Sequence, residues 1–489
     1  MFDTAELGRS LDKASYEGQL SELRTGLLKA QQALMEAPFP VMVLIHGMDA
    51  AGRGEVFNIL HEWLDARYLD REVYEPPTEE ERQRPEYWRY WQWLPEKGRI
   101  GLFLGSWYSA PLFLRAHGKL GSKTYLRDLE RAAAFETMLA DDGALFIKIW
   151  LHISKAEQKR RLKMFHERGA ERFRIQKHDF KRHARYDEFA SAAARAIRET
   201  STAHAPWTVV EATNERYRDV TVARCLIERI NQQVAAKSDA GAARALDAHV
   251  SDPITILDTL DLSQRLRDEE YSARKAAAHA QLNRLAARMY KRKRSAIFVF
   301  EGWDAAGKGG AIRRITRAID ARQYRVIPTG VPNDEERAHH YLWRFWRDLP
   351  RPGRITIYDR SWYGRVLVER VEKFATEAEW KRAYYEINDF EEQLVRHGSI
   401  VVKFWLHVSP DEQLRRFRER AAEPFKQYKL TDEDFRNRQR TSLYEAAVND
   451  MLGATDTEYA PWVLVEADDK HFARVKVLET VCQRLEREL

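Results

Sequence analysis

Short runs of β-branched and aromatic residues alternate with longer, more polar stretches along this chain. The clearest of these runs lie at residues 41–45, 297–300, 355–358 and 401–405. They predict buried strands, because continuous apolar runs of this length are typical of strands covered on both faces. Charged, Ala- and Leu-rich segments at about residues 16–36 and 271–293 each predict one long exposed helix. The alternation predicts an α/β fold, in which helices cover both faces of a parallel sheet.

The whole pattern occurs twice, at a constant offset of 255 residues that takes Gly47 to Gly302. The matching segments are 47–54 and 302–309, 106–108 and 361–363, 148–154 and 403–409, and 205–207 and 460–462. Solenoid repeats have periods of about 20 to 50 residues, so this one is a tandemly duplicated domain. We expect domains at residues 1–234 and 251–489. Residues 235–250 are small and polar without an apolar period, which predicts a linker.

The segment EGWDAAGKGG, residues 301–310, follows a predicted strand and precedes a sequence compatible with a helix. Gly302, Gly307 and Lys308 fit the pattern G-x-x-x-x-G-K. In such a loop, backbone amides and the helix N-terminus surround an anion, and the lysine adds a positive charge. We expect phosphate contacts from Gly302, Ala305, Ala306, Gly307, Lys308, Gly309 and Gly310. The loop therefore predicts phosphoryl transfer.

Two carboxylates accompany this loop. Gly309 stands where a Ser or Thr hydroxyl usually reaches a metal ion, and Asp304 is a plausible replacement. A carboxylate facing a polyphosphate is repelled unless a divalent cation lies between them; the alternative is that Asp304 caps the following helix. Asp359 directly follows the strand at 355–358, and Arg360 comes next. We expect Asp304 and Asp359 to hold Mg²⁺, while Lys308 and Arg360 neutralise the transferred group.

The first copy lacks part of this set. Arg53 replaces the loop lysine, Leu104 stands in the place of Asp359, and Gly105 in the place of Arg360. Leucine cannot hold a metal ion, so we expect the first domain to be catalytically inactive.

A cluster of cations follows the strand at 401–405 in the second copy. It contains Arg415, Arg418, Arg420, Lys426 and Lys429. These residues could form a flap that closes over a phosphate chain and excludes water. The alternative is an ordinary exposed helix whose arginines pair with Glu412 and Glu419; we favour the flap.

Composition limits the partners. Lys and Arg outnumber Asp and Glu by 81 to 75, a small excess for 489 residues. This balance favours a local basic groove for a polyanion over a nucleic-acid coat, and the run at 291–294 is typical of a solvated helix end. Two cysteines at non-equivalent positions give no disulfide framework. Without an apolar leader or membrane-spanning stretch, we expect a cytoplasmic protein with neither membrane nor nucleic-acid partners.

Taken together, these motifs resemble the polyphosphate kinase 2 family, in its fused two-domain polyphosphate:AMP phosphotransferase form. The resemblance rests on residues 302–310, 341–344, 359–365, 368–371 and 426–429 and covers both copies. It implies a P-loop kinase-like fold with a helical lid, Mg²⁺, inorganic polyphosphate as donor and AMP as acceptor, giving ADP. It carries the catalytic roles to Asp304, Lys308, Asp359 and Arg360. It also implies donor-channel or lid roles for Arg418, Lys426 and Lys429, and an inactive first domain.

The residues alone leave alternatives open. One is a polyphosphate-dependent kinase that converts ADP to ATP, since no residue selects the number of phosphates on the acceptor. An ATP-dependent nucleotide kinase and a non-catalytic polyphosphate-binding protein are the others. We also expect the two copies to form an intramolecular pseudo-dimer, so that the isolated second domain would self-associate through the exposed face.

Overall fold

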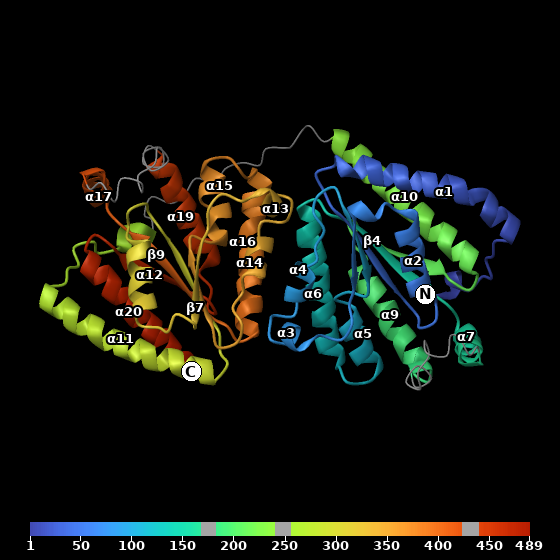
Figure 1. Cartoon of the computed structure of the whole chain (residues 1–489), viewed down its shortest axis with the longest axis horizontal. Coiled ribbons are helices and arrows are strands. Elements are labelled where there is room, and N and C mark those ends of the chain that lie inside the picture. The colour runs from blue at the N-terminus through green and yellow to red at the C-terminus, as the bar shows by residue number, and fades with distance from the viewer. Residues whose placement is uncertain (168–181, 240–255, 423–439) are drawn as a thin grey trace. The chain divides into compact units, whose positions relative to one another are not determined.

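The computed structural model describes residues 1–167, 182–239 and 256–489. These residues form two compact units, one built almost entirely from the first copy and the other almost entirely from the second (Figure 1). Each unit contains one five-stranded sheet flanked by helices, so the chain has a duplicated α/β fold.

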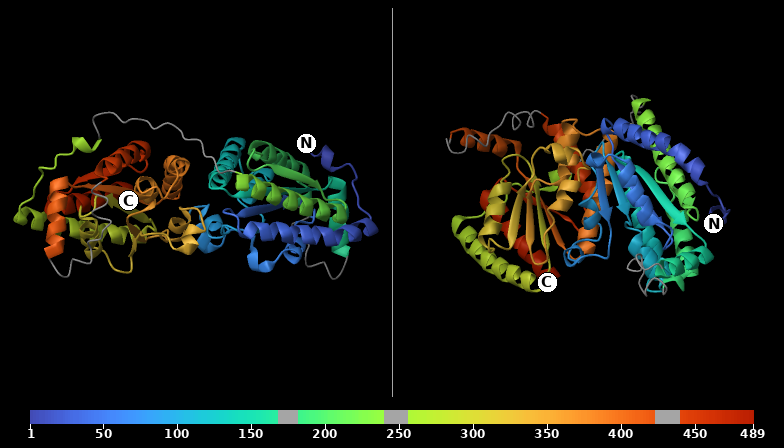
Figure 2. Two further views of the ribbon diagram at one scale, coloured as in Figure 1. Left: turned by 90° about the horizontal axis from the view of Figure 1, so that it is seen from above. Right: turned by 45° about the vertical axis from the view of Figure 1, so that its right-hand side comes forward.

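The two sheets have the same topology. The strands of the first are β1 (Val41–Gly47), β2 (Leu69–Val73), β3 (Ile100–Leu104), β4 (Leu145–His152) and β5 (Trp207–Glu211), in the order β2-β3-β1-β4-β5. Those of the second are β6 (Ala296–Gly302), β7 (Tyr324–Pro328), β8 (Ile355–Asp359), β9 (Ile400–His407) and β10 (Trp462–Glu466), in the order β7-β8-β6-β9-β10. Every pairing in both sheets is parallel. The strands of each sheet lie side by side in the right-hand view of Figure 2.

Helices cover both faces of each sheet. In the first copy they are α1 (Lys13–Met35), α2 (Arg53–Trp63), α3 (Glu79–Arg82), α4 (Trp88–Trp91), α5 (Ser109–Ala116), α6 (Ser122–Asp141), α7 (Lys155–Glu167), α9 (Tyr186–Thr200) and α10 (Glu215–Asp239). Helices α1, α2 and α10 pack together on one face, whereas α5, α6 and α9 pack together on the other.

The second copy repeats this arrangement. Its helices are α11 (Asp268–Lys291), α12 (Lys308–Arg317), α13 (Asp334–Arg337), α14 (Trp343–Arg347), α15 (Val368–Val371), α16 (Glu377–Arg396), α17 (Pro410–Ala422), α19 (Thr441–Thr455) and α20 (Lys470–Glu488). Short 3-10 turns span Asp3–Ala5, Ala66–Tyr68, Ile256–Thr259 and Trp362–Arg365. Figure 1 shows α12 and α20 on one side of this sheet and α16 on the other.

The four predicted strands are present and are one to three residues longer than their apolar runs. The predicted long helices are α1 and α11, within three residues at each end. One boundary differs, because α10 continues to Asp239 and residues 235–239 of the predicted linker are therefore helical. Their sequence, AAKSD, begins with strong helix formers, which explains the extension. The rest of the predicted linker lies outside the described residues.

The central strands are completely buried. Residues 296–300 of β6 are 0% exposed, and Ala296, Phe298 and Phe300 belong to a core cluster that includes residues of α11, α12 and α20. No helix among the described residues is long and apolar enough to cross a membrane.

Candidate active site

The glycine-rich loop of the second copy connects β6 to α12. Gly302 has a backbone φ of +145°, and a Cβ there would lie 2.4 Å from the carbonyl oxygen of Leu406 on the adjacent strand β9. Gly307 has a φ of +108° and is the N-cap residue of α12. Both positions need glycine, the first because the strands approach so closely and the second because of its left-handed backbone. The sheet and the helix thus fix the path of the loop before any ligand binds.

A cavity of about 660 Å³ lies over this loop. Its lining includes Asp304, Ala305, Ala306, Gly307, Lys308, Gly309, Gly310, Asp359 and Arg360. The structure thus brings the four residues expected to be catalytic into one cavity with six of the seven loop residues expected to bind phosphate, whereas Gly302 does not line it. Five further cationic side chains also line the cavity: Arg313, Arg416, Arg420, Lys470 and Arg474. Of these, only Arg420 belonged to the flap predicted from the sequence.

The two predicted metal carboxylates reach this cavity from different elements. Asp304 lies in the loop, and its Oδ1 accepts a hydrogen bond from Arg360 Nη2 at 3.0 Å. Asp359 is the last residue of β8, beside Phe300 of β6. The N-cap residue of α12 is Gly307, so Asp304 does not occupy the capping position that was the alternative explanation for it. Within the described ranges, no group of three or more His, Cys, Asp or Glu residues could hold a metal ion.

Lys308 is held against the loop. Its Nζ donates to the carbonyl oxygens of Gly302 at 2.6 Å and Trp303 at 3.2 Å. Burial lowers the pKa of Lys308, and the negative charge of Asp304 partly opposes that shift. The ammonium group is therefore a positive charge that carbonyl oxygens of the loop solvate at the wall of the cavity.

Arg360 has an unusual backbone for its residue type. Its φ is +65°, in the left-handed region that a residue with a Cβ rarely adopts. Such a conformation raises the free energy of the folded state by roughly 1–3 kcal/mol and is found where the surrounding structure enforces it, often at functional sites. The strained turn directs Arg360 toward Asp304 at the edge of the cavity.

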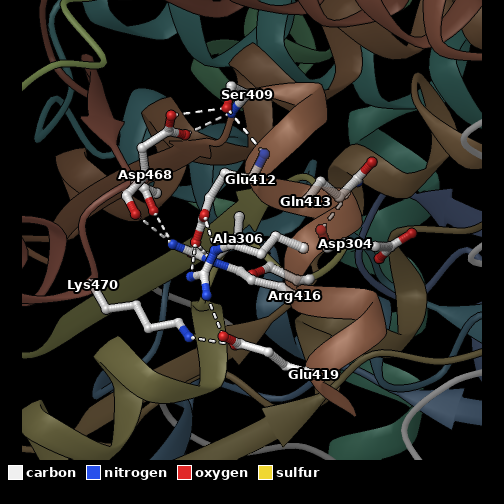
Figure 3. Close-up of polar contacts among 12 residues, drawn as sticks. Asp304, Ala306, Ser409, Glu412, Gln413, Arg416, Glu419, Asp468 and Lys470 are labelled. Atoms are coloured by element: carbon white, nitrogen blue, oxygen red, sulfur yellow. Dashed lines mark hydrogen bonds and ion pairs between the residues drawn. The ribbon is translucent and has the colours of Figure 1, made fainter. Parts of the chain in front are cut away.

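A buried arginine forms hydrogen bonds with the backbone of the loop. Arg416 of α17 is 3% exposed, and its guanidinium donates to the carbonyl oxygens of Ala305, Ala306, Ala467 and Asp468 at 2.5 to 3.2 Å. Glu412 accepts from its Nε at 2.6 Å (Figure 3). Next to it, Gln413 donates to the carbonyl oxygen of Asp304 at 3.1 Å. These contacts clamp the loop to α17 and to the end of β10.

A second, smaller cavity of about 100 Å³ adjoins the first. Aromatic and aliphatic side chains dominate its walls, namely Trp303, Leu367, Val368, Trp405, His407 and Tyr444. Trp303 Nε1 donates to His407 Nδ1 at 3.0 Å, and burial lowers the pKa of that histidine. Trp303, Asp304 and Arg360 line both cavities. Trp303 was missed from the sequence, where it reads as an ordinary loop residue.

The predicted flap is described only in part. Arg418 on α17 is exposed and lines neither cavity. Arg415 forms ion pairs with Glu412 and Glu419, as in the alternative of an ordinary exposed helix. Lys426 and Lys429 lie outside the described residues, as does the segment that connects α17 to α19 in the expected lid.

The first copy keeps the shape of the loop but lacks the two charged residues at the end of the neighbouring strand. Gly47 and Gly52 have φ values of +153° and +96°, close to those of Gly302 and Gly307. Leu104 ends β3 where Asp359 ends β8. Arg53 donates to Asp49 at 2.7 Å, so the residue in the place of Lys308 is paired within its own loop.

The sheet order, the glycine loop that begins α12 and the carboxylate that ends the neighbouring strand place the chain in the class of P-loop kinase-like proteins. The model of the family described as polyphosphate kinase 2 matches residues 10–238 and 265–489. The chain belongs to the polyphosphate kinase 2 family, and each of its copies is one domain of that family.

Similar proteins span the same length. A polyphosphate:AMP phosphotransferase of Pseudomonas aeruginosa is 48% identical over 489 residues, 99% of each chain. One of Acinetobacter johnsonii is 33% identical over 95% of this chain and 96% of its own. A crystal structure of a protein described as a putative polyphosphate kinase 2 from P. aeruginosa superimposes with a TM-score of 0.90 at 46% identity, covering 100% of this chain and 99% of that one. The tandem arrangement is thus common to these proteins.

Proposed function

We propose that this chain transfers the terminal phosphoryl group of inorganic polyphosphate to AMP, giving ADP, in the active site of its second copy. The observation that carries the proposal is the junction of two unlike cavities at Asp304 and Arg360. One cavity is rich in cations and backbone amides, and the other has aromatic walls. A phosphate chain fits the first, and the aromatic walls of the second offer a stacking surface for the base of a nucleotide whose phosphate reaches the junction. The names of the similar proteins agree with this pair of substrates.

The donor binds along the basic cavity. Amides at the start of α12 and the Lys308 ammonium hold the phosphates at the loop. Arg313 and Arg474 lie beside Gly309 and Gly310, where an added Cβ would be 3.6 and 3.7 Å from their guanidinium nitrogens. Arg418, which is exposed on α17, would bind the part of the polyphosphate that extends beyond this cavity. The family resemblance assigns the same role to Lys426 and Lys429, which lie outside the described residues.

Asp304 and Asp359 would hold Mg²⁺. Two carboxylates in a cavity built for phosphate fit a hard divalent cation that keeps several water or phosphate oxygens as its other ligands, since Mg²⁺ rarely takes a cage made of protein alone. Bound Mg²⁺ would supply charge neutralisation on the phosphate oxygens.

The transfer exchanges one P–O bond for another. A phosphate oxygen of AMP attacks the terminal phosphorus of the polyphosphate, and the bond from that phosphorus to its bridging oxygen breaks. The products are ADP and a polyphosphate one unit shorter. Lys308 and Arg360 stabilise the negative charge on the transferred group, and the Arg416 clamp keeps the loop in position during the transfer.

A substrate matrix tests this proposal. Purified full-length chain is incubated with Mg²⁺ and each pairing of AMP or ADP with long-chain polyphosphate or ATP, and the nucleotides are separated by chromatography. We expect ADP to form fastest from AMP and polyphosphate. Faster conversion of ADP to ATP would reassign the acceptor, whereas turnover with ATP but not with polyphosphate would reassign the donor. Binding of polyphosphate without turnover of any pair would leave a non-catalytic binding protein.

A further inference from the structure

An arginine lies directly against the glycine loop of the first copy. Arg218 of α10 is 2% exposed, and its Nη1 lies 1.7 Å from the position that a Cβ on Gly52 would take. In the second copy, nothing lies within 4 Å of the corresponding position at Gly307. The two loops therefore differ in what stands beside them as well as in their own residues.

The Arg218 side chain is fixed in this place. Its Nε donates to Asp219 at 2.8 Å, and its Nη1 is 3.4 Å from the carbonyl oxygen of Ala51 in the loop. Asp219 is itself 7% exposed. A buried guanidinium that is paired with a buried carboxylate is costly to expose, because moving either charge alone leaves the other without its partner.

The second copy carries a different pair at these positions. Ala473 stands where the first copy has Arg218, and Arg474 stands where it has Asp219. Ala473 and Arg474 both line the cavity over the loop. The short side chain leaves this cavity open, and the arginine one position later adds a positive charge beside Gly310.

We propose that Arg218 occupies the phosphate position of the first copy's loop, so that this copy binds no phosphate although it retains the loop glycines Gly47, Gly52 and Gly54. This inference rests on the proposed function, because it takes the loop of the second copy to be the donor site. The first copy is then closed by an internal side chain in addition to lacking Asp359 and Arg360 equivalents. Each chain has one donor site, and an exchange of the two residue pairs opens or closes a loop.

The test counts bound tripolyphosphate by isothermal titration calorimetry on full-length chains, at a salt concentration that screens weak surface binding. We expect one site in the native chain. The variant Arg218→Ala/Asp219→Arg, which gives the first copy the pair of the second, should bind two. The reciprocal variant Ala473→Arg/Arg474→Asp should bind none.

Two single variants separate the effect of the arginine side chain's volume from the effect of its positive charge. Arg218→Met keeps most of the volume without the charge and should still leave one site. Ala473→Arg adds a cation to the donor cavity, which by charge alone would tighten binding. We expect it instead to weaken binding by at least tenfold, because the new side chain fills the space beside Gly307. As a control, Arg474→Asp alone isolates the loss of that arginine and should weaken binding less than the double variant does.

The outcomes distinguish the two proposals. If the native chain binds no tripolyphosphate, the donor site of the proposed function is wrong. If the native chain binds one and both double variants also bind one with unchanged affinity, the role assigned to Arg218 is wrong. Should Arg218→Ala/Asp219→Arg fail to fold, as judged by circular dichroism and gel filtration, Ala473→Arg/Arg474→Asp decides alone, and native affinity in that variant would overturn the proposal.

Discussion

The two copies share one fold but differ at the residues proposed to act in catalysis. Comparing them separates the residues that maintain the fold from those that serve the reaction. Both copies hold their loop with a buried arginine, since Arg161 donates to the carbonyl oxygens of Ala50 and Ala212 as Arg416 does to those of Ala305 and Ala467. A clamp that persists in a copy without a counterpart of Asp359 belongs to the architecture of the loop.

A buried ion pair that is present in both copies also belongs to the fold. Lys148 and Glu136 in the first copy are 2.6 Å apart, and Lys403 and Glu391 in the second are 2.8 Å apart. All four side chains are at most 1% exposed. Burial lowers the pKa of both lysines, a shift that often marks a functional group. Because the pair is present in both copies and lines neither described cavity, we assign it a structural role.

The copies diverge at the carboxyl end of the central strands. Glu301 ends the buried part of β6 and accepts a hydrogen bond from Ser361 at 2.8 Å, whereas His46 takes the same place beside Ser106. Burial raises the pKa of the glutamate and lowers that of the histidine to about 3. The position can thus hold a carboxyl or an imidazole without change in the surrounding fold, and in both copies burial disfavours the charged form of the side chain.

The largest expected effect breaks the comparison at the metal carboxylate. Asp359→Asn keeps the shape of the side chain and removes its charge, and it should lower kcat by about 10³-fold or more, because a metal-bound transfer loses a ligand. The matched change in the first copy, Leu104→Asn, should leave steady-state rates within twofold. Near-normal turnover in Asp359→Asn would remove the second copy from its assigned role.

Removing the buried arginine that holds the loop should destabilise either copy, but it should abolish activity only in the second copy. Arg416→Met and Arg161→Met each leave several carbonyl oxygens without their donor and take from a glutamate one of its two arginine partners, which should lower the free energy of unfolding by roughly 3 kcal/mol. Chemical denaturation would measure this loss of stability. In activity assays at a low temperature at which both variants are folded, Arg161→Met should keep its activity, whereas Arg416→Met should lose most of it. Equal loss of activity in both would mean that the first copy contributes to turnover.

A smaller effect tests the strained arginine. Gly105, at φ +84°, has the backbone that Arg360 adopts at +65°, so the first copy holds the same turn without a Cβ. Arg360→Gly should lower kcat by about 100-fold through loss of the cation. Its free energy of unfolding should not fall, because the relief of backbone strain at this left-handed position offsets the loss of the half-exposed ion pair with Asp304. The reverse change, Gly105→Arg, should destabilise the protein by about 1 kcal/mol and leave activity unaffected. A destabilised Arg360→Gly would show that the strain is not real.

The smallest expected effect concerns pH. Lys308 loses its proton at a lower pH than an ordinary lysine because burial lowers its pKa, so kcat/KM for polyphosphate should fall as the pH rises through that value. Lys308→Arg keeps its charge over the whole range, and its profile should stay flat where that of the native chain declines. Arg53→Lys in the first copy should not alter the profile; a decline that survives in Lys308→Arg would have to come from another group.

Much of the fold was accessible from sequence because its central strands are buried on both faces. Continuous apolar runs marked β1, β6, β8 and β9. The edge strand β7, with the sequence YRVIP and largely exposed residues, carries no such run and was not predicted. Edge strands face solvent on one side, so their pattern is set by pairing with a neighbour that is distant in sequence.

The site divides in the same way. Asp304 and Lys308 were accessible because a loop between a strand and a helix has a local signature, and Asp359 because it follows a buried run. Arg474 was not, since it reaches the cavity from the last helix of the chain. Arg218 lies 167 residues from the loop carbonyl that it approaches, so only the folded chain shows that they meet. The offset of 255 could have pointed to it, because it pairs Arg218 with Ala473.

The buried arginine beside the first loop also determines how many substitutions would give the first copy a second active site. Leu104→Asp and Gly105→Arg would place a carboxylate and a cation at the strand end, yet Arg218 would still lie beside the loop. Arg218→Ala alone would remove that side chain but leave the buried carboxylate of Asp219 without its partner. An engineered second active site therefore requires the pair at positions 218 and 219 to change together with the residues at the strand end.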